Sequence, residues 1–214
     1  MKKIFGHFLR PFSAPKHPLD IMNKSSFAIR SDELAVARAR RGDAEAMEYL
    51  YRAYSGAVYS TALRICASVA DAEDITQDTF IEVFRKLHQY RGDAPFWAWL
   101  RRIAVNNTLM RLRHAKASKP SMDEEHEYMT VQQHTDHPAD QHDMERVLNS
   151  LSPTARAVVW LHDIEGYTHD EIGELMGKTS SFSKSQLSRA YEKLRSKLTW
   201  QTKQTTDIRT RKRS

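Results

Sequence analysis

The most informative stretch of the chain runs from Ser68 to Arg113, SVADAEDITQDTFIEVFRKLHQYRGDAPFWAWLRRIAVNNTLMRLR. Its apolar residues recur at the spacing of one helical face, first in an acidic segment and then in a basic, aromatic one. These apolar faces are Phe80, Val83, Phe84 and Leu87, followed by Phe96, Trp99, Leu100 and Ile103. Gly92 marks a turn between them, and Pro95 suits the first turn of a helix. The stretch therefore predicts two amphipathic helices joined by a turn over Tyr90–Asp93.

The remaining faces of these helices carry candidate binding residues. On the first helix, a second face comprises Asp74, Gln77, Asp78 and Ile81. On the second helix, Trp97 and Arg101 lie four positions apart, and we expect Asn106 and Arg113 nearby. An aromatic ring beside guanidinium groups suits stacking on unpaired bases and pairing with phosphates. A core helix with a solvated basic face remains an alternative, because such faces are common.

Residues 71–84, DAEDITQDTFIEVF, followed by residues 96–106, FWAWLRRIAVN, resemble the second conserved region of bacterial sigma factors. The resemblance is to the extracytoplasmic-function (ECF) group of the sigma-70 family. It implies that the first helix binds the clamp helices of RNA polymerase, and that the second helix opens and reads the minus-ten promoter element. The implied polymerase contacts are Asp74, Gln77, Asp78 and Ile81, and the implied minus-ten contacts are Trp97, Arg101, Asn106 and Arg113. The chain departs from the family at Met110, where an acid is usual.

The length and composition limit the number of domains, the fold class and the kind of partner. Its 214 residues allow one or two domains. Seven Gly and seven Pro are few for this length, and the helical spacing of apolar residues predicts an all-α protein. The net charge of +6 favours an anionic partner. A single cysteine, Cys66, excludes an internal disulfide framework and a Cys-rich zinc site, and we expect it to be buried as a small apolar residue.

The first thirty residues carry six basic side chains and one acid, Asp20. Their apolar run is interrupted by His7 and stopped by Arg10 and Pro11, so it is too short for a signal peptide. We expect a flexible basic extension over residues 1–30 and a cytoplasmic protein. Ser31 is the expected N-cap of a short helix through Arg40, opening a helical bundle over residues 31–117. Asp43 should cap the next helix, which continues toward Cys66.

Residues 118–143 form a predicted flexible linker, because eight acids and no Lys or Arg lie between Ser121 and Glu145. Its histidines, His126, His134, His137 and His142, match no standard zinc spacing, so no metal site is predicted. The family resemblance implies that the linker runs through or near the polymerase active-site channel. The acids could mimic nucleic acid there, or fold back on the basic faces of the free protein.

Residues 144–199 have the pattern of a helix-turn-helix domain. Ser152 and Pro153 predict a helix start, and Thr168 with Glu171 predicts a capping box for a short helix that Gly177 closes. The next helix should turn Phe182, Leu187, Ala190, Tyr191, Leu194 and Leu198 inward. Its other faces should present Ser183, Lys184, Gln186 and Arg189 to base edges and phosphates. A solvated helix in a bundle is the alternative.

Residues 148–177 and 184–198 resemble the fourth sigma region, which reads the minus-thirty-five element. Ser181, Phe182 and Ser183 depart from the usual family residues before Lys184. The tail, residues 200–214, has five basic residues and one acid, and we expect it to be disordered and to add nonspecific DNA affinity.

These observations predict an all-α protein of two helical bundles joined by a flexible linker. The predicted function is that of an ECF sigma factor, which binds core RNA polymerase and promoter DNA and needs no catalytic residue or cofactor. The family also implies an anti-sigma partner. A stand-alone helix-turn-helix regulator, with the N-terminal bundle as an oligomerisation module, is the main alternative. A metal-dependent hydrolase using the histidines and acids has no supporting motif.

Overall fold

A computed structural model describes residues 32–117 and 148–211, with side chains of the last helix described through Ser196. The chain divides into two compact units, with the boundary after Ser118. The described residues form helices and no strand, which confirms the all-α prediction. The predicted N-terminal extension and the predicted acidic linker lie outside the described residues.

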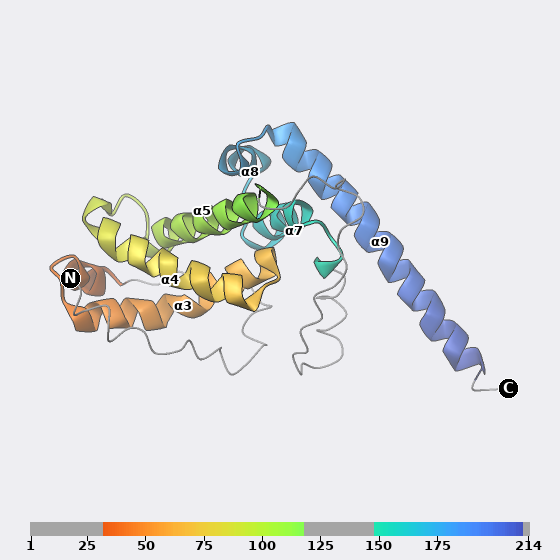
Figure 1. The fold of residues 1–214 in the computed structure, drawn as a ribbon, viewed down its shortest axis with the longest axis horizontal. Helices are drawn as coiled ribbons and strands as arrows, with labels where there is room; N and C mark the ends of the chain where they lie inside the picture. The colour runs from red at the N-terminus through yellow and green to blue at the C-terminus, as the bar shows by residue number, and fades with distance from the viewer. Residues whose placement is uncertain (1–31, 118–147, 212–214) are drawn as a thin grey trace. The chain divides into compact units, whose positions relative to one another are not determined.

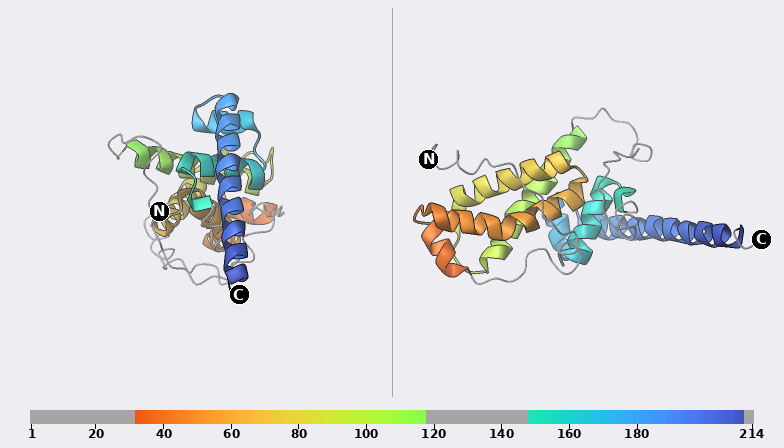
Figure 2. Two further views of the ribbon diagram at one scale, coloured as in Figure 1. Left: turned by 90° about the vertical axis from the view of Figure 1, so that its right-hand side faces the viewer. Right: turned by 90° about the horizontal axis from the view of Figure 1, so that it is seen from below.

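The described residues of the first unit, 32–117, form four α-helices (Figure 1). They are α2 (Glu33–Ala39), α3 (Ala44–Cys66), α4 (Val69–Lys86) and α5 (Phe96–Ala117), with a short 3-10 helix, Leu87–Gln89, after α4. Helix α3 packs against the other three, and α4 also packs against α5. Figures 1 and 2 show α3 and α4 running side by side.

The core of the first unit contains the apolar faces that the sequence predicts. Phe80, Val83 and Leu87 are buried on the α4 side, and Phe96 and Leu100 are buried on α5. Phe84, Trp99 and Ile103 pack against this core and are partly buried. Two amphipathic helices therefore form as expected, with their apolar faces sharing one core.

Two local predictions for this unit are wrong. Asp32 rather than Ser31 is the N-cap of α2, and its carboxylate caps no backbone group. The Asp32 carboxylate instead accepts hydrogen bonds from the hydroxyls of Tyr49 and Tyr54, at 3.0 and 2.5 Å. These hydroxyls compete with the backbone N–H groups of α2 for the carboxylate oxygens. Cys66 is only half-buried, because it ends α3 just before the chain turns at Ala67, whose φ is 54°. Asp43 caps α3 as predicted, accepting from the next helical turn.

The second unit contains α7 (Pro153–Val159), a π-helix (Trp160–Ile164), α8 (His169–Met176) and α9 (Ser180–Arg211). Helix α9 packs against both α7 and α8. Ser152 caps α7, and Thr168 and Glu171 form the predicted capping box of α8. Gly177 ends α8 with φ of 63°, a conformation that glycine adopts without a steric penalty. The helix-turn-helix pattern predicted from the sequence is confirmed.

Two helix boundaries in the second unit differ from the prediction. The helix expected through Leu161 changes to a π-helix at Trp160. The Trp160 carbonyl accepts a hydrogen bond from the backbone N–H of Glu165, five residues later, and the Trp160 indole donates to the Glu165 carboxylate at 3.3 Å. Helix α9 extends to Arg211, so the predicted disordered tail is helical up to that residue. Nothing after Gly177 interrupts it, because the remaining sequence contains neither Gly nor Pro. Across the described ranges, no helix has the length and apolar character needed to cross a membrane.

Candidate functional site

The exposed face of α4 carries Asp74, Gln77, Asp78 and Ile81, as the helical spacing predicts. The Asp74 side chain is 62% exposed, and Ile81 is 44% exposed despite being apolar. On the opposite face of the same helix, Phe80 and Val83 are buried in the core. Helix α4 is therefore anchored in the core on one face and exposes a mixed acidic and apolar surface on the other.

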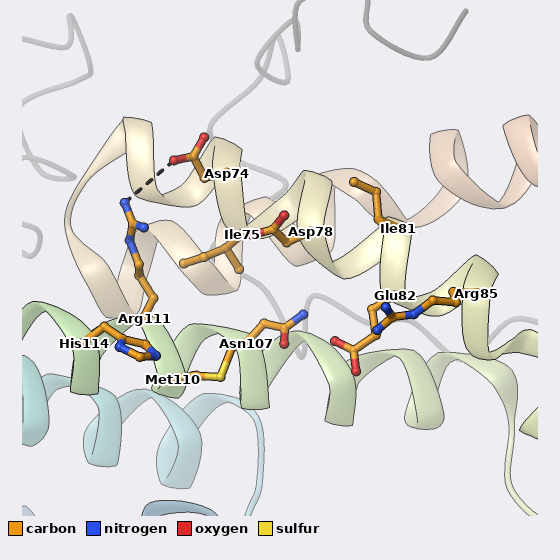
Figure 3. A pocket seen from close by; sticks show the side chains of 10 residues that line it. All are labelled: Asp74, Ile75, Asp78, Ile81, Glu82, Arg85, Asn107, Met110, Arg111 and His114. Carbon is orange, nitrogen blue, oxygen red and sulfur yellow. Dashed lines mark ion pairs between the residues drawn. The ribbon is translucent and has the colours of Figure 1, made fainter. Parts of the chain in front are cut away.

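This surface borders a groove of about 380 Å³ between α4 and α5, which we call the α4/α5 groove (Figure 3). It is lined by Asp74, Ile75, Asp78, Ile81, Glu82 and Arg85 from α4, and by Asn107, Met110, Arg111 and His114 from α5. Met110 is 49% exposed, so it and Ile81 offer apolar surface from opposite walls. The α5 wall was not predicted from the sequence, although positions 107, 110, 111 and 114 recur at the spacing of one helical face.

Most charges in the α4/α5 groove have partners. Arg111 donates to Asp71 at 2.7 Å and lies 3.7 Å from Asp74. Burial acts to raise the pKa of Glu82, but its hydrogen bonds with Lys86 and Asn107 and nearby positive charge lower that pKa overall. Asp78 is exposed and makes no hydrogen bond or ion pair within the described part of the chain. The groove thus offers an unpaired carboxylate beside two exposed apolar side chains, which suits a partner with basic and apolar groups.

The four candidate residues on α5 do not come together. The Arg101 guanidinium lies 5.1 Å from the centroid of the Trp97 ring, and both residues are half-buried. Asn106 and Arg113 are exposed, and at about 100° per residue they lie roughly 160 to 180° around the helix from Trp97. The expectation that all four are neighbours is therefore wrong. Asn106 and Arg113 follow Trp97 by nine and sixteen residues, which places them on another face of the helix.

The candidate residues on α9 are divided by burial. Lys184 and Arg189 are exposed and Gln186 is half-buried, but Ser183 is fully buried. The expectation that Ser183 faces outward is wrong, because it lies four residues before Leu187 and seven before Ala190, on the same buried face. Its hydroxyl lies 3.0 Å from His169 Nδ1, which joins α9 to α8.

Tyr191 also lies on a different face from the one predicted. It is 41% exposed, and its hydroxyl donates to both carboxylate oxygens of Asp163 at 2.9 Å. The buried position belongs to Ala190, and the next residue is turned about 100° away from it. Tyr191 therefore ties α9 to the π-helix instead of filling the core.

Two histidines stack within the second unit. The rings of His162 and His169 are 4.5 Å apart at 19°, and His162 Nδ1 lies 2.8 Å from the Asp163 carboxylate. Burial lowers the pKa of His169, and the positive charges of His162 and Lys184 lower it further, while Asp163 and Asp170 offset part of the effect. No sequence pattern pointed to this pair, because stacking depends on how the π-helix meets α8.

We expect the stability of the second unit to fall in acid because of His169. Its pKa in the folded state lies below the ordinary value of 6.5, so just below pH 6.5 the unfolded chain binds more protons than the folded one. The contribution of neutral His169 to the stability of the second unit is present above pH 6.5. It is lost as the pH falls through the lower folded-state pKa of His169. Denaturant midpoints from pH 7.5 to 5.0 should decrease less in His169→Gln than in the wild type. His88→Gln, at an exposed histidine of the first unit, should follow the wild type, and an unchanged slope in His169→Gln would contradict this origin.

Gly173 allows α8 to approach the turn before α9. A Cβ atom built there would lie 2.9 Å from the Lys178 carbonyl oxygen and 3.0 Å from the Ser180 nitrogen. Both contacts are shorter than side chains normally make, and both are to backbone. This role of Gly173 was not predicted from the sequence, although a glycine within an apolar helical pattern is a signal of close packing.

Among the residues that the structure describes, no cluster of three or more His, Cys, Asp or Glu could hold a metal ion. The four histidines between Ser121 and Glu145 lie outside that part of the chain.

Comparisons with known proteins match each unit. The family Sigma-70 region 2 matches residues 50–118, and Sigma-70, region 4 matches residues 141–194. The chain is 34% identical over 165 residues to the ECF RNA polymerase sigma factor SigE of Mycolicibacterium smegmatis. That alignment covers 72% of this chain and 63% of the relative's length.

Two further proteins align with this chain over nearly their full length. The ECF RNA polymerase sigma-E factor of Haemophilus influenzae is 26% identical, over 78% of this chain and 95% of the relative. A solved structure of the sigma factor RpoE with the anti-sigma factor NepR, from Bartonella quintana, has a TM-score of 0.52 and 23% identity. It covers 71% of this chain and 96% of that chain, and it supports the helical fold.

Proposed function

Because this chain belongs to the ECF group of the sigma-70 family, we propose that it binds core RNA polymerase and directs promoter recognition, promoter opening and transcription initiation at a specific set of genes. Members of this family are not enzymes, so phosphodiester chemistry is assigned to the polymerase. The chain would act in the cytoplasm, where the polymerase and the promoters are.

The exposed α4 face carries this proposal. Asp74, Gln77, Asp78 and Ile81 form a rigid acidic and apolar surface on the unit that resembles sigma region 2. DNA phosphates repel carboxylates, so this face is unsuited to DNA, and the stand-alone regulator gives it no polymerase role. The test is gel filtration with sigma-free core RNA polymerase: co-elution supports the sigma assignment, whereas DNA binding without co-elution favours the stand-alone regulator.

Region 2 would also capture the opened minus-ten element. Trp97 with Arg101 and the separate exposed pair Asn106 and Arg113 form two contact sets on different faces of α5. Stacking of bases on an aromatic side chain is worth about 1 to 3 kcal/mol per base, which offsets the cost of unpairing. We assign the stacking platform to Trp97 and the phosphate contacts to the exposed basic face.

The second unit would read the minus-thirty-five element through Lys184, Gln186 and Arg189 on α9. These three residues are at least partly exposed, while the buried Ser183 only helps to hold α9 against α8. Lys184 and Arg189 suit phosphates or guanine edges, and the Gln186 amide suits adenine.

The role of Arg189 is tested by Arg189→Ala in holoenzyme, on a panel of promoter variants. If Arg189 contacts phosphate, affinity should fall by a similar factor on all sequences. The slope of log affinity against log salt concentration should then decrease in magnitude by about 1. A base contact would instead cost about 1 to 3 kcal/mol at one promoter position. Arg40→Ala removes the same charge from an exposed position in the first unit and should change neither quantity. Unchanged binding by Arg189→Ala would remove this residue from the interface.

An anti-sigma protein is a further proposed partner. The related Bartonella quintana sigma factor was solved in complex with its anti-sigma factor. For this chain, we assign such a partner to the α4 face or the α9 face, because covering either one blocks a required contact. Pull-down of a neighbouring gene product that also inhibits transcription in vitro would identify it.

A further inference from the structure

We propose that the N-terminal segment of the chain, residues 2–12, binds in the α4/α5 groove and competes there with core RNA polymerase. Occupancy of the groove is inferred from its own chemistry. Only the identity of the competitor rests on the proposed function. The N-terminal segment would thereby lower the affinity of the free sigma factor for the polymerase.

The groove is suited to a short basic and apolar peptide. The lining carries the basic side chains Arg85, Arg111 and His114 as well as three acids. Arg111 pairs with Asp71 and lies 3.7 Å from Asp74, which is largely exposed, and the carboxylate of Asp78 has no partner within the described part of the chain. Ile81 and Met110 expose apolar surface on the two walls. Figure 3 shows Asp78 and Ile81 on α4 and Met110 across from them on α5. A cation would pair with the carboxylates while an apolar side chain covers Ile81 and Met110.

The N-terminal segment has the complementary composition. Residues 2–12, KKIFGHFLRPF, contain no acid, and the first acid of the chain is Asp20. Its cations are Lys2, Lys3 and Arg10, and its large apolar residues are Ile4, Phe5, Phe8, Leu9 and Phe12. The segment therefore offers the cations and apolar side chains that complement the carboxylates and apolar surface of the groove.

The tether between the segment and the bundle is long enough. The chain joins the bundle at Asp32, which Tyr49 and Tyr54 hold against α3. Residues 13–31 can span up to about 60 Å when extended. Helix α3, the longest of the bundle, has 23 residues and is about 35 Å long. The segment can therefore reach any face of the first unit.

Because the N-terminal segment and the α4/α5 groove belong to one chain, even a weak interaction between them gives high occupancy. A connection of about this length gives an effective concentration on the order of 1 mM. A segment with an intrinsic Kd of about 100 µM would then occupy the groove about nine-tenths of the time. A competitor for the same surface would bind about ten-fold more weakly.

Occupancy of the groove is tested on the full chain by zero-length carbodiimide cross-linking, which joins a lysine amine to a carboxylate with loss of water. Mass spectrometry of the monomer should find Lys2 or Lys3 joined to Asp74 or Asp78. The cross-link should disappear in Asp74→Asn, Asp78→Asn and persist in Asp170→Asn, a change at an exposed acid of the second unit. Cross-links from Lys2 and Lys3 only to acids outside the groove, or none at all, would overturn the proposal.

Competition is tested by reversing the charge of the segment. Lys2→Glu, Lys3→Glu, Arg10→Glu should bind core polymerase about ten-fold more tightly than the wild type. The matched control, Lys203→Glu, Arg209→Glu, Arg211→Glu, makes the same charge change near the other terminus and should not. Equal effects of the two triple variants would reject competition at the groove. If no variant binds polymerase, the proposed function fails, and cross-linking still decides groove occupancy.

Discussion

Asp74→Lys, Asp78→Lys will abolish co-elution of the chain with core RNA polymerase. Both carboxylates are on the exposed face of α4, and Asp78 has no partner within the described part of the chain. A partner surface that complements these two carboxylates would be basic, so in the variant it would meet two lysines, and like charges across an interface cost several kcal/mol. We expect the Kd to rise at least about 100-fold, since each 1.4 kcal/mol is a factor of ten.

The control for this variant keeps the charge change and moves it away from the groove. Glu45→Lys, Glu48→Lys alters two exposed acids near the start of α3, whose ion pairs with Arg38 and Arg52 are surface pairs of small energetic value. This control should still co-elute with the polymerase. Circular dichroism should show both variants folded. Retained co-elution of the Asp74, Asp78 variant at moderate salt would exclude the α4 face as the main polymerase contact.

Gly173→Ala will unfold or rearrange the helix-turn-helix while leaving the first unit folded. The added methyl group would lie 2.9 Å from the Lys178 carbonyl oxygen and from the Thr179 carbonyl carbon, and neither backbone atom can rotate away. Overpacking usually costs about 1 to 3 kcal/mol, and a contact with backbone should lie at the upper end. Holoenzyme containing the variant should still form, because the proposed polymerase contacts are on α4, in the other unit. Its affinity for duplex minus-thirty-five DNA should fall at least about ten-fold.

Gly56→Ala provides the matched control in the other unit. Gly56 lies within α3, where a Cβ would meet no atom within 4 Å. The same substitution should there stabilise the protein by about 0.5 to 1 kcal/mol, because alanine favours a helix over glycine. Thermal unfolding followed by circular dichroism, with DNA binding by fluorescence anisotropy, distinguishes the two. A Gly173→Ala protein with wild-type stability and DNA affinity would show that the turn can move aside.

Much of the fold and part of the candidate site follow from the sequence. Residues that act within one helix were predicted correctly: the buried faces of α4 and α5, the Asp43 cap and the Thr168 capping box. The exposed α4 face was predicted for the same reason, since helical periodicity places four residues on one side. The tail was mispredicted because charge was taken as a sign of disorder, whereas the absence of Gly and Pro left α9 uninterrupted to Arg211.

Local features follow from the sequence alone: helix positions, their caps, the order of the two units and their resemblance to two sigma-70 regions. Tertiary structure decided which faces meet, and hence that Met110 and Arg111 complete a groove with α4, that Ser183 is buried against His169, and that α8 contacts the turn at Gly173. The physical reason is that periodicity and capping involve residues within one helical turn, whereas burial and grooves depend on the packing of helices whose contacts are distant in the chain.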